Sequence, residues 1–488
     1  MERQDTTASL GHSISPSLCP AMYDTIIIGA GLSGLAAGIR LAYYEQRVCI
    51  VERHYTIGGL NSFYRLRGRD YDVGLHAVTN FASKGAKKGP LVRLLRQLRL
   101  SWEDFSLAPQ LGSTIAFPGV RLNFSNDIRL LESEIDRNFP HHVDAFQRLL
   151  AQILDYDDLN QDVFELSARQ VLANTISDPL LVEMLLCPTM WYGNAREDDM
   201  DWGQFCIMFR ALYLEGMGRP HAGIRLILKN LVRRFRALGG ELKLRCGVRQ
   251  IHTERDRAVG VRLENGQQLT ARNILSSAGA VETLRLCESQ DEESRGEPAA
   301  SRAGQLSFVE SLSVLSQQPK SVGFDKTIVF FNDSERFHWQ KPAEAFCDVR
   351  TGVICSPNNF AYSPAEGELA ENMIRITALA DFPRWNSLSE EPYRLEKLRW
   401  YDRISESAVR FVPDFRSRVI DTDMFTPMTI RRFTGHENGA IYGGPHKRLD
   451  GTTGVKNLYI CGTDQGYLGI IGALVSGVSM ANRHCLRI

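Results

Sequence analysis

Short apolar runs rich in β-branched residues alternate along this chain with longer stretches of helical periodicity. Residues 23–28 form such a run and predict a buried strand, and residues 32–44, rich in Ala and Leu, predict a helix. Residues 47–51 predict a second strand. Strands that alternate with helices in this way predict an α/β fold.

Three glycines, Gly29, Gly31 and Gly34, stand in GxGxxG spacing between the first predicted strand and the helix. The first permits a tight turn, the second lets the backbone approach a pyrophosphate, and the third lets helix and strand pack closely. The helix N-terminus also offers unpaired N–H groups to phosphate. Glu52 ends the second strand, where a carboxylate accepts hydrogen bonds from a ribose diol. This context predicts a dinucleotide site rather than a glycine-rich turn that serves packing alone.

A second glycine-rich turn lies near the other end of the sequence. Residues 457–461 predict a buried strand, Gly462-Thr463-Asp464 follow it, and residues 469–473 begin a helix. Two interpretations are open. The helix N-terminus faces a bound group whose negative charge it stabilises, or the helix only packs on the first strand.

Further strands are predicted in the middle of the chain. Those of the first group are residues 241–245, 248–253, 259–264 and 274–277, with a turn at Asn265-Gly266 and an end at Ala278-Gly279. Those of the second group are residues 307–315, 327–331 and 373–379, and residues 128–138 predict a helix.

The residues after Glu52 favour FAD over NAD. A glycine pair, Gly58-Gly59, precedes a stretch with strand alternation around a turn at residues 67–68, and DVGLH follows at residues 72–76. This succession resembles the FAD-binding start of the amine oxidase and phytoene desaturase superfamily. Within the superfamily, residues 219–244, 426–444 and 457–482 are most similar to the phytoene desaturase, carotenoid isomerase and retinol saturase group.

The resemblance implies an α/β architecture with two domains. One is a Rossmann-type, glutathione-reductase-like FAD-binding domain built from discontinuous segments, expected at residues 21–85, 215–290 and 415–488. The other is a mixed α+β substrate domain, expected at residues 86–214 and 291–414. Residues 1–20, polar and rich in Ser, Thr and Pro, are expected to form a flexible tail.

The resemblance also implies a set of site residues. Asp464 is expected to contact the ribityl–phosphate part of FAD, and the backbone of Val248 is expected to contact the adenine. The helix that starts near Gly472 is expected to point at the pyrimidine end of the isoalloxazine. The full set of expected FAD-binding residues is Gly29, Gly31, Leu32, Ser33, Gly34, Glu52, Arg53, Gly58, Gly59, Leu60, Val248, Ala278, Gly279, Gly462, Asp464, Gly469, Ile470, Ile471 and Gly472.

Three residues are candidates for catalysis beside the flavin: His76, Tyr442 and Tyr467. A histidine can transfer a proton near neutral pH when a C–H bond breaks or forms. A lone histidine beside apolar residues also fits a purely structural role, and both interpretations of His76 stay open.

The resemblance implies an FAD-dependent oxidoreductase that acts on carbon–carbon bonds of a hydrophobic isoprenoid or carotenoid-like lipid. Desaturation is the first expectation, followed by saturation or isomerisation. An amine oxidase is the alternative within the superfamily. A prenyl-lipid escort without redox turnover is the alternative outside it, which the surviving glycines, Glu52 and Asp464 disfavour.

Composition limits the binding partners, the cellular compartment and the metal sites that the protein is expected to have. Lys plus Arg equals Asp plus Glu, 57 each, which argues against nucleic acid as a partner. The ten cysteines form no CxxC pair, and the polar residues 1–20 lead us to expect no signal peptide, so we expect reduced thiols in a cytoplasmic protein. Histidine spacing predicts no metal site. The sequence does not indicate an oligomeric state.

Two patterns carry alternative interpretations. Residues 84–100 combine six basic residues with a leucine face, which fits peripheral contact with a membrane or, slightly favoured, inward packing of the leucines. Aromatic residues gather at 189–192, 205–213 and 330–331, where they line an apolar tunnel or, more commonly, form ordinary core.

Overall fold

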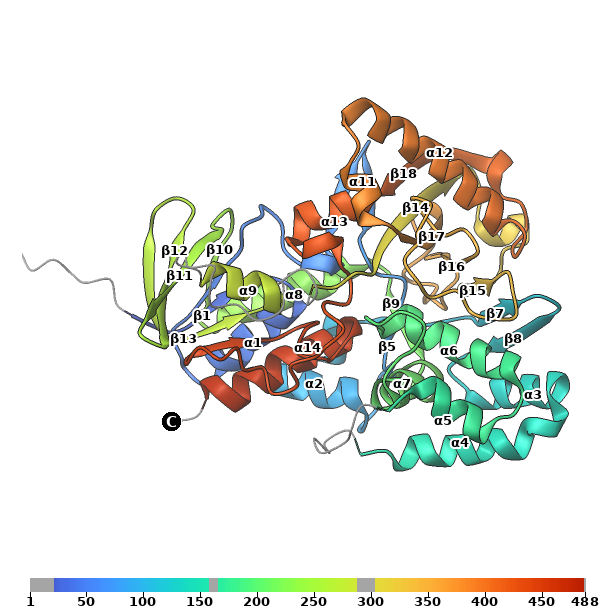
Figure 1. Cartoon of the computed structure of the whole chain (residues 1–488), viewed down its shortest axis with the longest axis horizontal. Coiled ribbons are helices and arrows are strands. Elements are labelled where there is room, and N and C mark those ends of the chain that lie inside the picture. Colours follow the sequence, from blue (N-terminus) through green and yellow to red (C-terminus); the bar gives the residue numbers. More distant parts are fainter. Residues whose placement is uncertain (1–21, 158–165, 288–302, 487–488) are drawn as a thin grey trace, which may run out of the picture.

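The computed structural model describes residues 22–157, 166–287 and 303–486. The expected flexible tail, residues 1–20, lies outside the described residues. The described chain contains two seven-stranded sheets, a three-stranded sheet and a two-stranded hairpin. Helices cover the faces of both large sheets (Figure 1). The predicted α/β class is confirmed by this arrangement.

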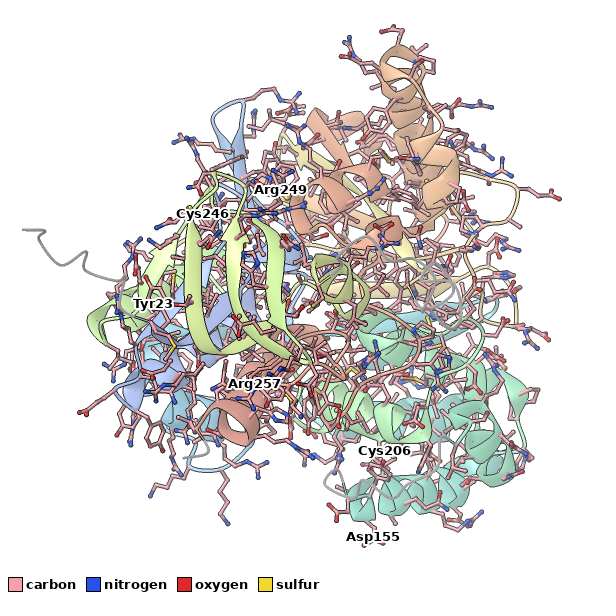
Figure 2. The ribbon with its side chains drawn as sticks, turned by 60° about the vertical axis from the view of Figure 1, so that its left-hand side comes forward. Tyr23, Asp155, Cys206, Cys246, Arg249 and Arg257 are labelled. Atoms are coloured by element: carbon pink, nitrogen blue, oxygen red, sulfur yellow. The ribbon has the colours of Figure 1, made fainter. Side chains whose placement is uncertain are left out.

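The first sheet has strand order β10-β2-β1-β13-β12-β11, and β19 pairs with β13. Strands β1, β2, β10, β13 and β19 run parallel to their neighbours, whereas β11, β12 and the start of β13 form an antiparallel meander. Figure 2 brings this meander forward, with Arg249 and Arg257 labelled on it. The strands are β1 (Tyr23–Ile28), β2 (Val48–Val51), β10 (Glu241–Lys243), β11 (Val248–Glu254), β12 (Arg257–Leu263), β13 (Gln268–Ser276) and β19 (Leu458–Ile460).

Four helices pack beside this sheet: α1 (Leu32–Tyr43), α2 (Pro90–Leu98), α8 (Ile224–Ala237) and α14 (Gly469–Met480). Helices α1 and α14 approach closely, because a Cβ at Gly477 would lie 2.0 Å from the carbonyl oxygen of Ser33. Only glycine fits there. Segments more than 400 residues apart in the sequence are thereby joined along the first sheet (Figure 1).

The second sheet has strand order β18-β14-β17-β16-β15-β7-β8 and is antiparallel except at the β15–β7 pair. Alternate residues along its strands enter two cores, as Phe330 and Phe331 do on opposite faces. The strands are β7 (Ser113–Phe117), β8 (Val120–Phe124), β14 (Ser307–Leu315), β15 (Ile328–Asn332), β16 (Thr351–Cys355), β17 (Asn372–Ala380) and β18 (Val419–Phe425).

A helical layer covers one face of the second sheet, and α11 and α12 cover the other (Figure 1). The layer consists of α3 (Ile128–Asn138), α4 (Val143–Asp155), α5 (Ala168–Thr175), α6 (Pro179–Gly193) and α7 (Trp202–Phe209); on the other face lie α11 (Phe382–Asn386) and α12 (Glu390–Ala408). The small sheet joins β5 (Val78–Thr79), β9 (Met217–Pro220) and β6 (Leu107–Pro109), and the hairpin joins β3 (Phe63–Leu66) to β4 (Arg69–Asp72).

Strand pairing changes one of the expected domain boundaries, the one at residue 415. Strand β18 falls within residues 415–488, expected in the FAD-binding domain, yet it pairs with β14 in the second sheet. The chain therefore leaves the second sheet after Phe425 rather than near residue 415. The other expected domain limits stay predictions.

The amphipathic helix α2 turns its leucines inward. Leu91, Leu94, Leu95 and Leu98 are buried in the core shared with α1 and α14. The inward-packing interpretation of residues 84–100 fits this placement. Among the described residues, no helix is both long enough and apolar enough to span a membrane.

Candidate active site

A cavity opens between the first sheet and the second, and three glycine-rich segments reach it. Its lining includes the β1–α1 turn, the Gly58-Gly59 pair and the turn before α14, together with residues of β14, β16, β17 and α6. Of the expected FAD-binding residues, those that line it are Gly29, Gly31, Leu32, Ser33, Glu52, Arg53, Gly58, Gly59, Leu60, Val248, Ala278, Gly462, Gly469 and Ile470.

The β1–α1 turn leaves room for a phosphate group. Gly29 has φ +95°, and a Cβ there would lie 2.5 Å from Oγ of Ser277. A Cβ at Gly31 would meet no atom within 4 Å, so this position is open towards the cavity. No side chain caps the N-terminus of α1, and no acidic residue lies in its first turn. This end of the helix is therefore suited to an anion.

Glu52 is fixed at the carboxyl end of β2. Its Oε2 accepts a hydrogen bond of 2.8 Å from the Ala30 N–H, and its Oε1 accepts one of 2.8 Å from the His54 N–H. A carboxylate oxygen can accept more than one hydrogen bond, so both oxygens keep capacity for a ribose hydroxyl. The backbone bonds hold the carboxylate in place before any ligand binds.

The glycine pair closes the other side of the β1–α1 turn. The Gly58 N–H donates to the Ala30 carbonyl at 2.9 Å, and a Cβ at Gly58 would lie 2.7 Å from the Asn61 carbonyl oxygen. Arg53 also lines the cavity, but its Nη2 donates at 2.8 Å to the Arg432 carbonyl near the end of α13 (Pro427–Thr434). Arg53 thus ties the cavity wall to α13.

Five expected FAD-binding residues do not line the cavity. Gly34 serves helix–strand packing, since a Cβ there would lie 2.1 Å from the Gly29 carbonyl oxygen. Gly279, with φ +103°, precedes α9 (Ala280–Leu286), and Ile471 is buried in the core beside α1. Gly472 packs against Tyr467, and that tyrosine, expected in catalysis, lies outside the lining too.

Asp464 is the fifth, and its side chain is held by two backbone N–H groups; its expected ribityl–phosphate contact stays a prediction. Its Oδ2 accepts from the Ala280 N–H and its Oδ1 accepts from the Gly444 N–H, each at 2.6 Å. The side chain is buried. Asp464 therefore joins three segments of the chain beside the cavity, and its neighbours Gly462 and Thr463 line the cavity.

The DVGLH stretch brings His76 to the cavity. Asp72 accepts a hydrogen bond of 3.2 Å from the Ile224 N–H at the start of α8 and pairs with Arg219 at 2.5 Å. Gly74 has φ +67°, and a Cβ there would lie 2.4 Å from the Leu60 carbonyl oxygen. This turn requires glycine and directs the chain so that His76 lines the cavity.

A buried polar cluster surrounds His76. Its Nε2 lies 3.5 Å from Oε1 of Glu310 and 3.1 Å from Oγ1 of Thr377. Glu310 also pairs with Arg375, and both side chains are almost fully buried. Burial opposes the charge of Glu310, but Arg375 and His76 outweigh it and hold the pKa of this carboxyl well below its usual range.

Sequence reasoning missed Glu310, Thr377 and Arg375. Glu310 is the one charged residue of β14, SFVESLSVL, and Arg375 is the one charged residue of β17, NMIRITALA, which also holds Thr377. A charged residue inside a buried strand must have a partner, and this was the available signal.

Aromatic side chains form the rest of the wall on this side. Trp191 and Tyr192, at the end of α6, line the cavity with Phe308 and Tyr442. The Tyr442 hydroxyl donates to the Trp191 carbonyl, and burial raises its pKa. The tunnel interpretation fits residues 191–192, whereas Phe330 and most of residues 205–213 are buried core.

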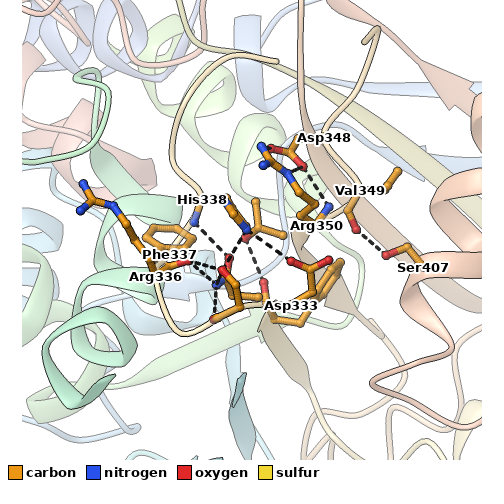
Figure 3. Close-up of polar contacts among 12 residues, drawn as sticks. Asp333, Arg336, Phe337, His338, Asp348, Val349, Arg350 and Ser407 are labelled. Atoms are coloured by element: carbon orange, nitrogen blue, oxygen red, sulfur yellow. Dashed lines mark hydrogen bonds and ion pairs between the residues drawn. The ribbon is translucent and has the colours of Figure 1, made fainter. Parts of the chain in front are cut away.

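Figure 3 shows a second polar cluster. The cavity lining does not include its residues Asp333, Ser334 and His338. His338 Nε2 lies 3.3 Å from Asp333 and 2.9 Å from Ser334 Oγ. In a serine hydrolase triad, the serine and the carboxylate contact different ring nitrogens. Here both contact the same nitrogen, so the cluster does not have triad geometry.

No group of His, Cys, Asp and Glu within the described ranges is arranged to hold a metal ion. The absence of a metal from the reaction stays a prediction. The donor set described above instead fits a dinucleotide: an uncapped helix N-terminus, an open glycine, and a fixed carboxylate at the end of β2.

The chain matches the family model of flavin containing amine oxidoreductases over residues 32–321, more than half of its length. It belongs to this family and is an FAD-dependent enzyme. The expected cofactor and superfamily are confirmed. The roles of individual residues towards FAD stay predictions.

Two relatives align over most of the chain. Prolycopene isomerase of Daucus carota is 24% identical, and the alignment covers 98% of this chain and 81% of the isomerase. The 4,4'-diaponeurosporene oxygenase of Staphylococcus aureus is 22% identical, covering 86% of this chain and 87% of the oxygenase.

Solved structures share the fold. An oxidoreductase from Methanosarcina mazei has a TM-score of 0.64 at 15% identity, covering 94% of this chain and 99% of that chain. Putrescine oxidase bound to putrescine has a TM-score of 0.61 at 16% identity, covering 96% of this chain and all of the oxidase.

Proposed function

We propose that the protein isomerises a carbon–carbon double bond of a carotenoid-like polyene with the help of FAD. The observation that carries this proposal is the apolar and aromatic wall that continues the cavity beyond the glycine turns. Trp191, Tyr192, Phe308 and Val353 contribute to it. The alignment with prolycopene isomerase over 98% of the chain supports the same substrate class.

The charge of this region disfavours an amine substrate. An ammonium group taken out of water is compensated most directly by an unpaired carboxylate. Glu310 is the carboxylate on this side of the cavity, and Arg375 already neutralises it. A neutral polyene needs no such counterion, which favours it over an amine.

Isomerisation replaces desaturation as the first choice of reaction. Desaturation moves a hydride from the substrate to the flavin, whereas isomerisation leaves no net redox change. The same apolar cavity serves both reactions. We choose isomerisation because prolycopene isomerase covers this chain more fully than does the diaponeurosporene oxygenase.

FAD, when bound, supplies a redox-active ring that accepts or donates a hydride or stabilises developing charge. The chain's own residues perform the remaining tasks. The β1–α1 turn and Glu52 bind the dinucleotide, and the aromatic wall orients the polyene and excludes water. Residues 21–85, 215–290 and those after Phe425 would hold the cofactor, and the second sheet with its helices would hold the substrate.

The test uses FAD-loaded protein without oxygen and prolycopene in liposomes. One sample carries oxidised flavin and the other carries flavin reduced beforehand, and both are followed by flavin absorbance and by chromatography of the carotenoids. We expect a product of the same mass with altered double-bond geometry and an unchanged flavin spectrum.

Other outcomes contradict the proposal. A product with an additional double bond and bleaching of oxidised flavin would establish desaturation. Unchanged prolycopene in both samples, with binding verified by co-sedimentation, would reject a polyene isomerase. An apolar lipid bound by protein that takes up no FAD would favour the escort alternative.

A further inference from the structure

We infer that His76 exchanges a proton with the bound polyene through its Nδ1 atom, and that Glu310 is the positioning residue that holds the ring for this exchange. The inference rests on the proposed function, since it specifies the chemistry of the same site. Geometry on two strands of the second sheet carries it.

Both protein contacts of the imidazole fall on one nitrogen. Glu310 and Thr377 are direct cross-strand partners in the β14–β17 pairing. Their side chains approach the same Nε2 atom of His76, at 3.5 Å and 3.1 Å. The fixed register of two central strands therefore sets the position of this side of the ring.

Arg375 holds both Glu310 and the backbone next to His76. Its Nε donates to Glu310, and its Nη1 donates at 2.6 Å to the carbonyl oxygen of Leu75, the residue before His76. Arg219 donates to the same carbonyl at 3.2 Å. One guanidinium thus holds the carboxylate and the backbone that carries the imidazole.

The ionised carboxylate decides which nitrogen bears hydrogen. A carboxylate only accepts hydrogen bonds, so Nε2 carries the proton in the neutral ring. Nδ1 is then an acceptor, and in the imidazolium it becomes a donor. Within the described part of the chain, Nδ1 has no hydrogen-bond partner, and His76 lines the cavity with 15% of its side chain exposed.

The proton step balances without an added oxidant or reductant. Nδ1 of the neutral ring first takes up a proton from the solvent. The resulting imidazolium gives this proton to one carbon of a double bond in the conjugated chain, and the π pair of that double bond forms the new C–H bond. The positive charge is delocalised along the polyene, so the former double bond rotates. The same carbon then returns a proton to Nδ1, and the double bond re-forms in the other geometry.

The cavity wall favours this charged state. The rings of Trp191, Tyr192 and Phe308 line the cavity and present π-electrons to a cation. The charges of Arg375 and Arg219 are compensated by Glu310 and Asp72, so they do not oppose a cation strongly.

The experiment runs the prolycopene reaction in D2O with wild-type holoenzyme. We expect deuterium in a fraction of the isomerised product, because the carbon that is protonated loses either isotope. His76→Gln should lose isomerisation and labelling together, by about 100-fold or more. Isomerised product without deuterium from the wild type would overturn the inference while leaving the proposed function intact.

Glu310→Gln tests positioning. We expect kcat to fall about 100-fold with KM changed little, since the amide no longer fixes the Nε2–H form of the ring. Nitrogen NMR of histidine-labelled holoenzyme should show His76 as the Nε2–H form in the wild type and a mixture in Glu310→Gln. Retention of the wild-type form and of kcat in this variant would contradict the role of Glu310.

Two further variants separate positioning from folding. Glu134 is also a buried carboxylate paired with an arginine, Arg137, but it lies on α3 and does not line the cavity. Glu134→Gln should keep wild-type kcat and labelling. Thr377→Val leaves the Glu310–Arg375 pair intact and should lower kcat less than Glu310→Gln; an equal or larger loss would assign the positioning to Thr377 instead.

Discussion

The two walls of the cavity are built by different means. On the side of the first sheet, the wall is mostly backbone: positive-φ glycines, an uncapped helix end and one carboxylate held by N–H groups. On the side of the second sheet, the wall is made of side chains that project from strands, from the end of α6 and from the segment around Tyr442. The first wall suits a cofactor common to many enzymes, and the second suits one substrate and its chemistry.

The largest expected effect is complete loss of bound flavin, and two glycines in the first wall test it. Gly34→Val places side-chain atoms against the Gly29 carbonyl oxygen, where even a Cβ would lie at 2.1 Å. We expect a loss of about 3 kcal/mol in the free energy of unfolding and a protein purified without flavin. Urea unfolding and flavin absorbance measure both.

Gly31→Ala is the matched variant. The space around Gly31 is open, so the apo protein should unfold at the wild-type urea concentration. FAD affinity should still fall at least about 10-fold, because a methyl group would stand where a pyrophosphate approaches. Equal FAD affinity in this variant and the wild type would show that the turn serves packing alone.

The second prediction concerns the other wall and its buried charge pair. Glu310→Gln leaves Arg375 without a compensating charge and should cost about 3–5 kcal/mol at pH 7. Because the pKa of Glu310 is lowered in the folded protein, its contribution is present above the ordinary carboxyl range and is lost as the pH falls below about 4.3.

The stability of the wild type and of Glu310→Gln should therefore converge in acid. Urea unfolding from pH 7 down to pH 3 measures the difference between them. A constant difference over this range would show that the pKa of Glu310 is not lowered in the folded protein.

The third prediction tests Glu52 as a ribose acceptor. Glu52→Gln keeps one carboxamide oxygen for a backbone N–H but removes the charge, and we expect FAD to bind about 10-fold more weakly, or about 1.4 kcal/mol. Fluorescence quenching of added FAD measures it. If FMN, which lacks the adenosine, lost affinity equally, Glu52 would act on the fold rather than on the ribose.

The smallest effect concerns Tyr442, which was expected in catalysis. Its hydroxyl already donates a hydrogen bond to the Trp191 carbonyl oxygen. Tyr442→Phe should lower the free energy of unfolding by about 1 kcal/mol and leave kcat within about 3-fold of wild type. A loss of kcat near that of His76→Gln would make Tyr442 a catalytic residue.

The first wall was largely predictable from the sequence, because local spacing encodes it. GxGxxG, the Gly58-Gly59 pair and Glu52 each lie at a turn whose geometry depends on nearby residues. The range predicted for β14, residues 307–315, also agrees with the structure. Periodicity in an apolar strand identifies the strand whatever its neighbours are.

The second wall was not predictable in the same way. Glu310 meets Thr377 only through the pairing of β14 with β17, and no local pattern contains that register. The hydrogen bonds of Asp464 could not be predicted for the same reason, since its partners Ala280 and Gly444 come from other segments of the chain. The clustering of aromatic residues in the sequence did not show that Trp191 would line the cavity while Phe330 would lie in the core.

The contact of α1 with α14 has a consequence for biosynthesis. The β1–α1 unit leaves the ribosome more than 400 residues before α14, yet Gly477 seats against Ser33 and the α14 turn completes the cavity. The β1–α1 unit of the nascent chain therefore remains without its α14 partner, and the cavity remains incomplete, until late in translation. Flavin content consequently reports whether α14 has been made and docked, and a chain stopped before Gly469 is expected to emerge colourless.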